Sequence, residues 1–238
     1  MTKTAVIVGA TGGIGAGCAR ELHDRGFSLV LNGRRREPLE SLAAEVGGRA
    51  VVGDCTVEAD MAALFAGLDS VDLLVHAAGV LRGKPLREQS NEVFEDVIRT
   101  NLISPHLAIR EALPLMKAGA RIVLISSLAA TRPMRGLTAY SAAKAGMNAL
   151  ALALSDELEA DGINVNLVSP GAVDTPMMGQ SARGFASLRP EDVAAVVGWL
   201  STLEPRILIP DIFFRAPDRG PFSEVAGGGG SEGMASSD

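Results

Sequence analysis

Tyr140 and Lys144 are the two residues of this chain whose types and spacing point most directly to chemistry. Tyr140 is the only tyrosine among 238 residues, and on a helix a residue four positions later projects from the same face. A free phenol has a pKa of about 10, and a neighbouring ammonium group lowers that pKa because it favours the phenolate. The pair therefore predicts that Tyr140 acts as a general acid, protonating a carbonyl oxygen while hydride reaches the carbonyl carbon.

Ser127 and Asn101 are candidates for the remaining polar contacts of such a site. Ser127 follows the apolar run 121–125, and ligands of open α/β sheets bind at the carboxyl ends of the strands. Its hydroxyl either polarises the carbonyl or caps a turn. Asn101 lies in residues 88–117, a stretch that predicts a long helix, where asparagine has a poor propensity. We expect Asn101 either to bend that helix around a water molecule or to be exposed.

The sequence GATGGIG, residues 9–15, predicts a turn that binds a phosphate group. Gly9, Gly13 and Gly15 follow the apolar run 4–8 and open a helical pattern. Because these residues have no Cβ atoms, backbone N–H groups and the helix N-terminus can approach a pyrophosphate. Tight turns use glycine for other reasons as well, but the strand–turn–helix context favours a dinucleotide site.

The residues after the second apolar run indicate which dinucleotide is bound. NAD sites usually place a carboxylate there for the ribose 2′-hydroxyl, whereas NADP sites have a cation. This chain reads Asn32, Gly33, Arg34, Arg35, Arg36, and a guanidinium group matches a phosphate well. We therefore expect NADP(H) in preference to NAD(H), bound by Arg34 and Arg35. The alternative is a solvated basic patch.

Two further strand ends add candidate cofactor contacts. Asp54 follows the third apolar run and either accepts a hydrogen bond from the adenine amino group or caps the next helix. The sequence HAAG, residues 76–79, follows the fourth run. There Gly79 would let the backbone pass close to the cofactor.

Short apolar runs alternate with helical patterns along the chain. The runs are residues 4–8, 28–31, 50–52, 73–75, 121–125 and 164–168, and the main helical patterns are 15–25, 37–46, 57–67, 88–117, 138–160 and 191–203. This alternation predicts an α/β fold, a doubly wound parallel sheet of the Rossmann type with helices on both faces. Residues 206–215 predict a last strand, and Pro210 within it predicts a sheet edge or a bulge. We expect one domain, residues 1–215, and a flexible Gly/Ser-rich tail, residues 216–238.

Composition argues against several classes of partner. A net charge of −6 and a pI of about 5.2 offer no general attraction to nucleic acid or to an anionic membrane. No apolar run approaches the length of about 18 residues that spans a bilayer. Cys18 and Cys55 are too few for a disulfide framework and fit a reducing compartment. We expect a cytoplasmic protein with a small-molecule substrate and no metal.

On these motifs the chain resembles the short-chain dehydrogenases/reductases, in particular the 3-oxoacyl reductases and small carbonyl reductases. The resemblance covers about residues 3–203. The three glycines match the family's Gly-x-x-x-Gly-x-Gly turn, and SPGAVDT, residues 169–175, matches its Pro-Gly stretch. The family's catalytic set of Asn, Ser, Tyr and Lys is matched by Asn101, Ser127, Tyr140 and Lys144.

The resemblance implies a role for each of these residues. Tyr140 is the general acid/base, while Lys144 lowers its pKa and binds the nicotinamide ribose. Ser127, favoured over its neighbour by the family's spacing, orients the carbonyl. Asn101 holds a water molecule for proton relay, and Thr175 contacts the nicotinamide amide. The expected cofactor-binding residues are Gly9, Thr11, Gly13, Ile14, Gly15, Arg34, Arg35, Asp54, Ala78, Gly79, Tyr140, Lys144, Pro170, Gly171, Val173 and Thr175. The assembly that the family implies is a homodimer or a homotetramer.

Three features depart from the family pattern. His76 and Ala77 replace the two asparagines of the usual Asn-Asn-Ala-Gly motif, and His76 is either a structural histidine or a catalytic base. The segment 176–190 is short, which predicts a small lid. The last strand ends in FFRAP instead of Asp-Gly-Gly, so the usual tetramer contacts are in doubt.

The sequence therefore predicts an NADP(H)-dependent oxidoreductase that acts on a small or medium carbonyl compound or secondary alcohol. The alternatives are an NAD-linked alcohol dehydrogenase and a non-catalytic dinucleotide-binding regulator. The expected pocket is apolar, formed by Leu128, Met134, Leu137, Met177, Met178 and Phe185. Arg132 and Arg135 at its mouth would suit a substrate that is acidic at one end, whereas a steroid or a cationic amino ketone would fit poorly.

Overall fold

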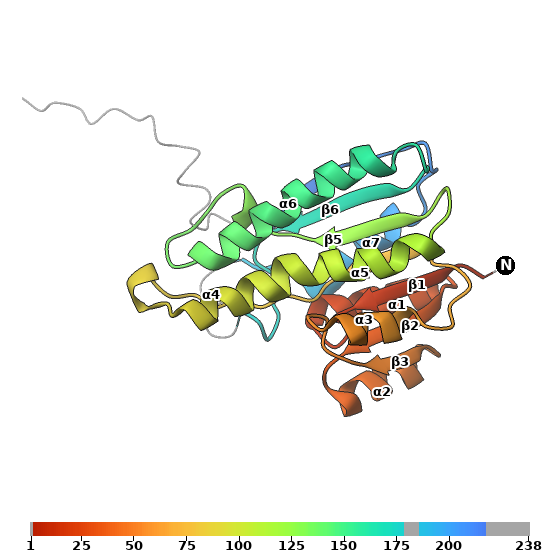
Figure 1. The fold of residues 1–238 in the computed structure, drawn as a ribbon, viewed down its shortest axis with the longest axis horizontal. Helices are drawn as coiled ribbons and strands as arrows, with labels where there is room; N and C mark the ends of the chain where they lie inside the picture. The colour runs from red at the N-terminus through yellow and green to blue at the C-terminus, as the bar shows by residue number, and fades with distance from the viewer. Residues whose placement is uncertain (1, 179–185, 218–238) are drawn as a thin grey trace, which may run out of the picture.

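A single parallel sheet forms the centre of the molecule (Figure 1). The computed structural model describes residues 2–178 and 186–217. Within them the strand order is β3-β2-β1-β4-β5-β6-β7. The strands are β1 (Thr4–Val8), β2 (Ser28–Gly33), β3 (Arg49–Val52), β4 (Leu73–His76), β5 (Arg121–Ile125), β6 (Asn164–Pro170) and β7 (Asp211–Phe214). This order confirms the predicted doubly wound α/β fold of the Rossmann type.

Helices cover both faces of the sheet, as Figure 1 shows. One face is covered by α1 (Gly13–Asp24), α2 (Arg36–Glu45) and α7 (Pro190–Leu200), and the other by α3 (Glu58–Phe65), α5 (Ser104–Ala112) and α6 (Thr138–Leu158). Strand residues alternate between the two faces, so that Ile7 packs with the first group of helices and Val6 with the second. Both faces are therefore buried, which explains the nearly continuous apolar runs of the strands.

The predicted single helix over residues 88–117 is wrong. In its place lie a short 3₁₀ turn (Leu86–Glu88), α4 (Asn91–Ile98), a π-helical turn (Arg99–Ile103), α5 and a second 3₁₀ turn (Leu113–Leu115). Pro105 lies in the first turn of α5, and proline has no N–H to continue an α-helical ladder. The chain therefore changes its hydrogen-bond spacing at the residues just before this proline.

The last strand is shorter than expected but lies where Pro210 predicted. β7 pairs only with β6 and forms one edge of the sheet. Pro210 precedes it, and the Pro210 carbonyl accepts a hydrogen bond from Leu167 N at 2.8 Å. The predicted tail lies outside the described residues except for Ala216 and Pro217.

The parallel register brings the functional motifs to one edge of the sheet. Val8 at the end of β1 is in register with Asn32 of β2 and His76 of β4, and His76 with Leu124 of β5. The strand order reverses between β1 and β4, and ligands of such sheets bind outside the carboxyl ends at this point. No helix within residues 2–178 and 186–217 is long and apolar enough to cross a membrane.

Candidate active site

Two adjoining cavities lie along the carboxyl edge of the sheet. The larger, about 350 Å³, is lined by Asn101, Ser127, Tyr140 and Lys144 among others. The smaller, about 240 Å³, is lined by Gly9, Thr11, Arg34, Arg35 and Asp54 among others. Ala77, Ala78, Gly79 and Met177 line both. The structure thus brings the predicted catalytic residues together at one end of a cleft and the predicted adenosine contacts together at the other.

Lys144 is a buried amine that lines the larger cavity. Its side chain lies one turn after Tyr140 on α6, and it is only 4% exposed. Lys144 Nζ donates a hydrogen bond of 2.7 Å to the carbonyl oxygen of Ile125, the last residue of β5. Burial lowers the pKa of Lys144 to about 7, because desolvation disfavours the ammonium form. The lysine is therefore a titrating group near neutral pH.

The pKa of Tyr140 moves in the opposite direction from the one expected. Burial raises it, and the hydroxyl of Ser127 only partly offsets that rise. Lys144 Nζ lies 5.9 Å from the centroid of the tyrosine ring and is directed to Ile125. The predicted lowering of the Tyr140 pKa by Lys144 is therefore not found in this structure, and the phenol stays protonated at neutral pH.

Ser127 caps a turn, which is one of the two roles that the sequence left open. Its hydroxyl accepts a hydrogen bond of 3.1 Å from Ala129 N and so caps the short 3₁₀ turn Leu128–Ala130. The same residue lines the larger cavity beside Tyr140. Its neighbour Ser126 instead donates to Asn148 Oδ1 at 2.5 Å. The cap holds the Ser127 hydroxyl at the end of β5, facing the phenol.

Asn101 is fully buried, so the expectation that it is exposed is wrong. It sits in the π-helical turn Arg99–Ile103. Its Nδ2 donates to the carbonyl oxygens of Val80 and Val97, both at 2.9 Å, and its Oδ1 accepts from Val80 N at 3.2 Å. The hydrogen-bond spacing of the helix changes here, and the amide of Asn101 binds the backbone that follows β4.

The glycine turn fits a pyrophosphate. Gly9 has φ of +80°, and a Cβ there would lie 2.5 Å from Ala78 N, so only glycine is accommodated. No side chain in the described structure caps the N-terminus of α1 at Gly12, which leaves N–H groups and the helix dipole free for an anion. Gly13 and Gly15 lie in the first turn of α1 and line neither cavity.

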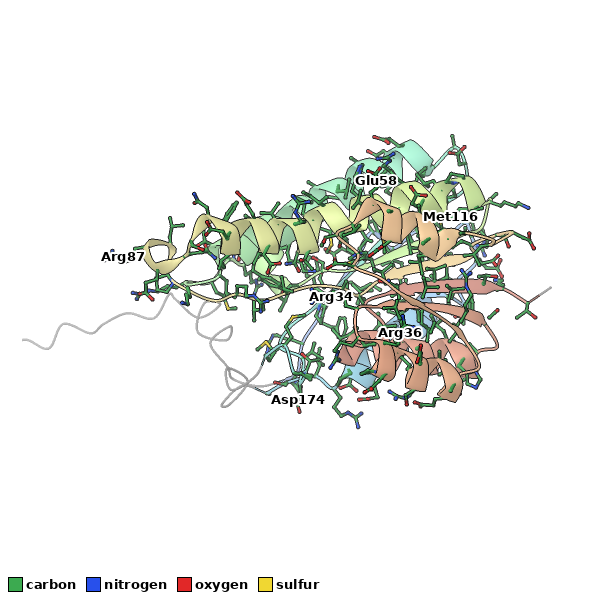
Figure 2. All side chains as sticks on the ribbon, turned by 60° about the horizontal axis from the view of Figure 1, so that its bottom comes forward. Arg34, Arg36, Glu58, Arg87, Met116 and Asp174 are labelled. Atoms are coloured by element: carbon green, nitrogen blue, oxygen red, sulfur yellow. The ribbon has the colours of Figure 1, made fainter. Side chains whose placement is uncertain are left out.

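The two predicted arginines line the smaller cavity. Arg35 donates from its guanidinium to the carbonyl of Thr11 at 3.2 Å, and Arg34 lies 3.7 Å from a carboxylate oxygen of Asp54. Arg36 pairs with Glu40 on the surface of α2, away from the cavity. Figure 2 shows Arg34 and Arg36 at separate places on the molecule.

Asp54 caps a turn and lines the cavity. Its Oδ1 accepts from the backbone N and the hydroxyl of Thr56, at 2.9 and 2.8 Å. It does not cap α3, whose N-cap residue is Val57. The second carboxylate oxygen lies 3.7 Å from the Arg34 guanidinium, so an acid and a cation meet at the smaller cavity.

Most of the remaining predicted residues lie in the same cleft. Ile14, Pro170, Gly171, Val173 and Thr175 line the larger cavity, together with the apolar pocket residues Leu128, Met134, Leu137, Met177 and Met178. Phe185 lies outside the described residues. His76 lines neither cavity, is 1% exposed, and contacts Ser104. This favours the structural histidine over the catalytic base.

Several lining residues were not predicted, Asn32 the most informative of them. Its Nδ2 donates to the carbonyls of Val51 and Gly53, at 3.3 and 3.1 Å, and so joins the ends of β2 and β3 under the smaller cavity. The sequence feature that could have identified Asn32 is a polar residue at the end of a buried apolar run. Cys55, Val80 and Thr100 also line this cavity and carried no such signal. Among residues 2–178 and 186–217, no three His, Cys, Asp or Glu side chains converge as metal ligands would.

Comparisons with a family model, with individual proteins and with solved structures all indicate the same family. The model of a family described as short chain dehydrogenase matches residues 3–184. The chain is 32% identical over 179 residues to the 3-oxoacyl-[acyl-carrier-protein] reductase FabG of Rickettsia bellii, covering 74% of each chain. It is 32% identical over 185 residues to carbonyl reductase family member 4 of Danio rerio, covering 74% of this chain and 78% of the relative. The crystal structure of BdcA in complex with NADPH superposes with a TM-score of 0.84 at 27% identity, over 90% of this chain and 93% of that one.

Lys144→Met is expected to remove a pH dependence of stability. In the unfolded chain a lysine titrates near 10.4, whereas in the folded protein burial lowers the pKa of Lys144 to about 7. Between these values the unfolded chain binds a proton that the folded chain does not, so the free energy of unfolding rises with pH. This contribution is lost as the pH falls through about 7.

Denaturant titrations at about pH 6 and about pH 9 measure this difference. The stability of the wild type relative to Lys144→Met should be greater at the higher pH. Lys117→Met, which changes an exposed lysine, is the control and should show no such change. An equal difference at both pH values for Lys144→Met would contradict the buried titration.

Proposed function

This chain belongs to the short-chain dehydrogenase/reductase family, and from that premise we propose that it is an NADP(H)-dependent carbonyl reductase with Tyr140 as its general acid/base. The observation that carries the proposal is the convergence of Ser127, Tyr140 and Lys144 on one cavity. That cavity adjoins a second one in which Arg34 and Arg35 face the expected 2′-phosphate. Hydride is transferred between the nicotinamide and the carbonyl carbon of a small or medium substrate.

The pKa directions suit the reductive direction. A bound nicotinamide cofactor would supply the hydride. Because burial raises the pKa of Tyr140, its hydroxyl carries the proton that the carbonyl oxygen needs at neutral pH. Ser127 holds the carbonyl oxygen beside that hydroxyl. The product is a secondary alcohol, and the phenolate regains its proton from solvent.

Lys144 would act on the cofactor and on the phenolate. Its amine lines the same cavity as Tyr140, where it can hold the ribose hydroxyls of the nicotinamide half. Once the phenol has given up its proton, a nearby ammonium stabilises the phenolate. With a pKa of about 7, Lys144 can take up a proton as that negative charge develops.

Tyr140→Phe tests the acid. Removal of a positioned proton donor costs about 10²- to 10⁴-fold in rate, so kcat with a carbonyl substrate should fall by that amount. The Kd for NADPH, measured by fluorescence titration, should change little because the ring is kept. An unchanged kcat would exclude Tyr140 as the general acid.

Arg34→Ala combined with Arg35→Ala tests the cofactor preference. Each lost charge-assisted hydrogen bond to the 2′-phosphate is worth about 1.5–3 kcal/mol, so the Kd for NADPH should rise at least tenfold while that for NADH barely moves. Arg36→Ala is the matched control, because Arg36 pairs with Glu40 on α2. Equal weakening of both cofactors by the double variant would mean that the arginines do not contact the 2′-phosphate.

The residues that form the walls and the rim of the larger cavity indicate which class of substrate it could hold. The segment before α4 runs beside the loop after Ser127, where Lys84 N donates to the Gly136 carbonyl at 2.8 Å. Apolar side chains of both segments, such as Leu81 and Met134, line the cavity. The cations that alternate with them, Arg82, Lys84, Arg132 and Arg135, are exposed.

Arg87, another cation of the same segment, lies farther out, at the outer end of the segment before α4 (Figure 2). Arg82 pairs with Asp96 at 3.6 Å. We assign a substrate that is apolar around the carbonyl and anionic at its far end.

Arg132→Ala combined with Arg135→Ala tests this assignment. Exposed ion pairs contribute roughly 0.2–1 kcal/mol each, so loss of two should raise KM for a keto acid about twofold to thirtyfold while KM for its neutral ester stays constant. Arg206→Ala, which changes an exposed arginine before β7, is the control. A loss that is the same for acid and ester would contradict the anionic end.

We also infer the cellular compartment from the cysteines and the oligomeric state from exposed apolar side chains. Cys18 and Cys55 are buried free thiols, as in proteins of the reducing cytoplasm. Leu152 on α6, Trp199 on α7 and Phe213 on β7 are about half exposed, at 51%, 47% and 49%. Apolar surface of this kind fits the homodimer or homotetramer that members of this family form.

A further inference from the structure

At the end of the π-helical turn that carries Asn101, one backbone carbonyl lacks a backbone donor. A side chain donates the missing hydrogen bond. Ser104 N donates to the carbonyl of Arg99, five residues back, instead of to Thr100. The next residue, Pro105, has no N–H to donate. The Thr100 carbonyl therefore lacks both of its helical donors, and Ser104 Oγ donates to it at 2.7 Å.

His76 completes this arrangement from the sheet. Its Nε2 lies 2.9 Å from Ser104 Oγ, and the single hydroxyl proton is already donated to Thr100. The hydroxyl must then accept from the ring, so His76 carries its proton on Nε2. Both side chains are buried, at 1% and 0% exposure. Burial lowers the pKa of His76 to about 3, and the charge of Lys144 adds to that effect, so the ring is neutral.

The two hydrogen bonds of the Ser104 hydroxyl leave its side chain with one preferred orientation. One proton is donated to the Thr100 carbonyl and one hydrogen bond is accepted from His76. The buried thiol of Cys55 lies nearby, and burial raises its pKa.

The hydroxyl of Ser104 joins the two elements that frame the middle of the cleft. His76 ends β4, and the residues that follow it, 77–79, line both cavities. The amide of Asn101 binds the backbone of Val80 on both its N–H and its carbonyl. The loop 77–80 is thus fixed to the π-helical turn at both ends, by His76–Ser104 before it and by Asn101–Val80 after it.

We propose that His76 and Ser104 are positioning residues, which set the π-helical turn and the loop 77–80 at the separation that hydride transfer requires. The proposal rests on the proposed reductase function. His76 stands where the family motif has asparagine, and imidazole Nε2 lies farther from the backbone than an asparagine amide does. The longer side chain reaches across to a hydroxyl that an asparagine would leave without this donor.

Three substitutions distinguish a positioning role of His76 and Ser104 from a role in which they only fill the core. His76→Gln keeps an N–H close to the place of Nε2, His76→Leu removes it, and Ser104→Ala removes the hydroxyl. A displacement of about 1 Å at a reacting centre can cost on the order of 10²-fold. Accordingly, kcat should fall about tenfold to 10²-fold in the Leu and Ala variants, with KM changing much less. The Gln variant should keep kcat within about threefold of the wild type.

His106→Gln is the matched control, since His106 is exposed on the same helix two residues after Ser104, and it should leave kcat unchanged. If Ser104→Ala keeps the wild-type kcat, or if His76→Gln loses as much as His76→Leu, then His76 and Ser104 do not position the site.

Nitrogen NMR of the histidine rings tests the geometry without any assay of activity. The chain has three histidines, and the signal lost in His76→Gln identifies the buried one. In the wild type this ring should be the neutral Nε2–H tautomer, unchanged from about pH 8 to about pH 5. A proton on Nδ1, or titration near the ordinary value of about 6.5, would overturn the proposal. If the tautomer is as expected but no carbonyl is reduced by the wild type, the reductase function fails while this hydrogen-bond geometry stands.

Discussion

The hydrogen bond from Lys144 Nζ to the carbonyl of Ile125 is the interaction on which the site depends. It joins the first turns of α6 to the carboxyl end of β5, and Tyr140 is one turn before it on the same helix. Ser127 lies two residues after Ile125. Its hydroxyl accepts a hydrogen bond from Ala129 N, which keeps it at the cavity. A single contact between an amine and a strand end thus sets the phenol against the serine. Its cost is the desolvation of an ammonium group, which is expressed as a pKa of about 7.

The middle of the cleft depends on the absence of side chains. Residues 77–79 pass between the two cavities and are alanine, alanine and glycine. A Cβ on Gly9 would collide with Ala78 N, and one on Gly79 would lie 2.8 Å from Asn101 Oδ1. β1, the loop after β4 and the π-helical turn therefore lie close together. Because few side chains project over them, there is room above for a flat, extended ligand. The same closeness makes the hydrogen bonds of His76, Ser104 and Asn101 decisive for the shape of the cleft.

The features that the sequence predicted well are those encoded locally. Apolar runs and the glycine turn predicted the strands, the start of α1 and the order of layers, and a proline predicted that β7 lies at an edge. The spacing of Tyr140 and Lys144 placed both on one helix face. What the sequence did not predict depends on tertiary contacts. The division of residues 88–117 follows from Pro105 and from bonds between Asn101 and Val80, which no helical propensity reflects. Likewise, the Tyr140 pKa is set by burial, so reasoning from a charge one turn away gave the wrong direction.

A crystal structure of the complex with NADP⁺ would show whether the cavity lined by Ser127, Tyr140 and Lys144 holds the nicotinamide. We expect the nicotinamide ring to occupy the larger cavity, with its ribose hydroxyls on Lys144 Nζ and the Tyr140 hydroxyl facing the reactive carbon. We also expect the pyrophosphate at the N-terminus of α1 and the 2′-phosphate between Arg34 and Arg35. A dinucleotide bound in the reverse direction, or one whose nicotinamide lies away from Ser127 and Tyr140, would contradict these expectations.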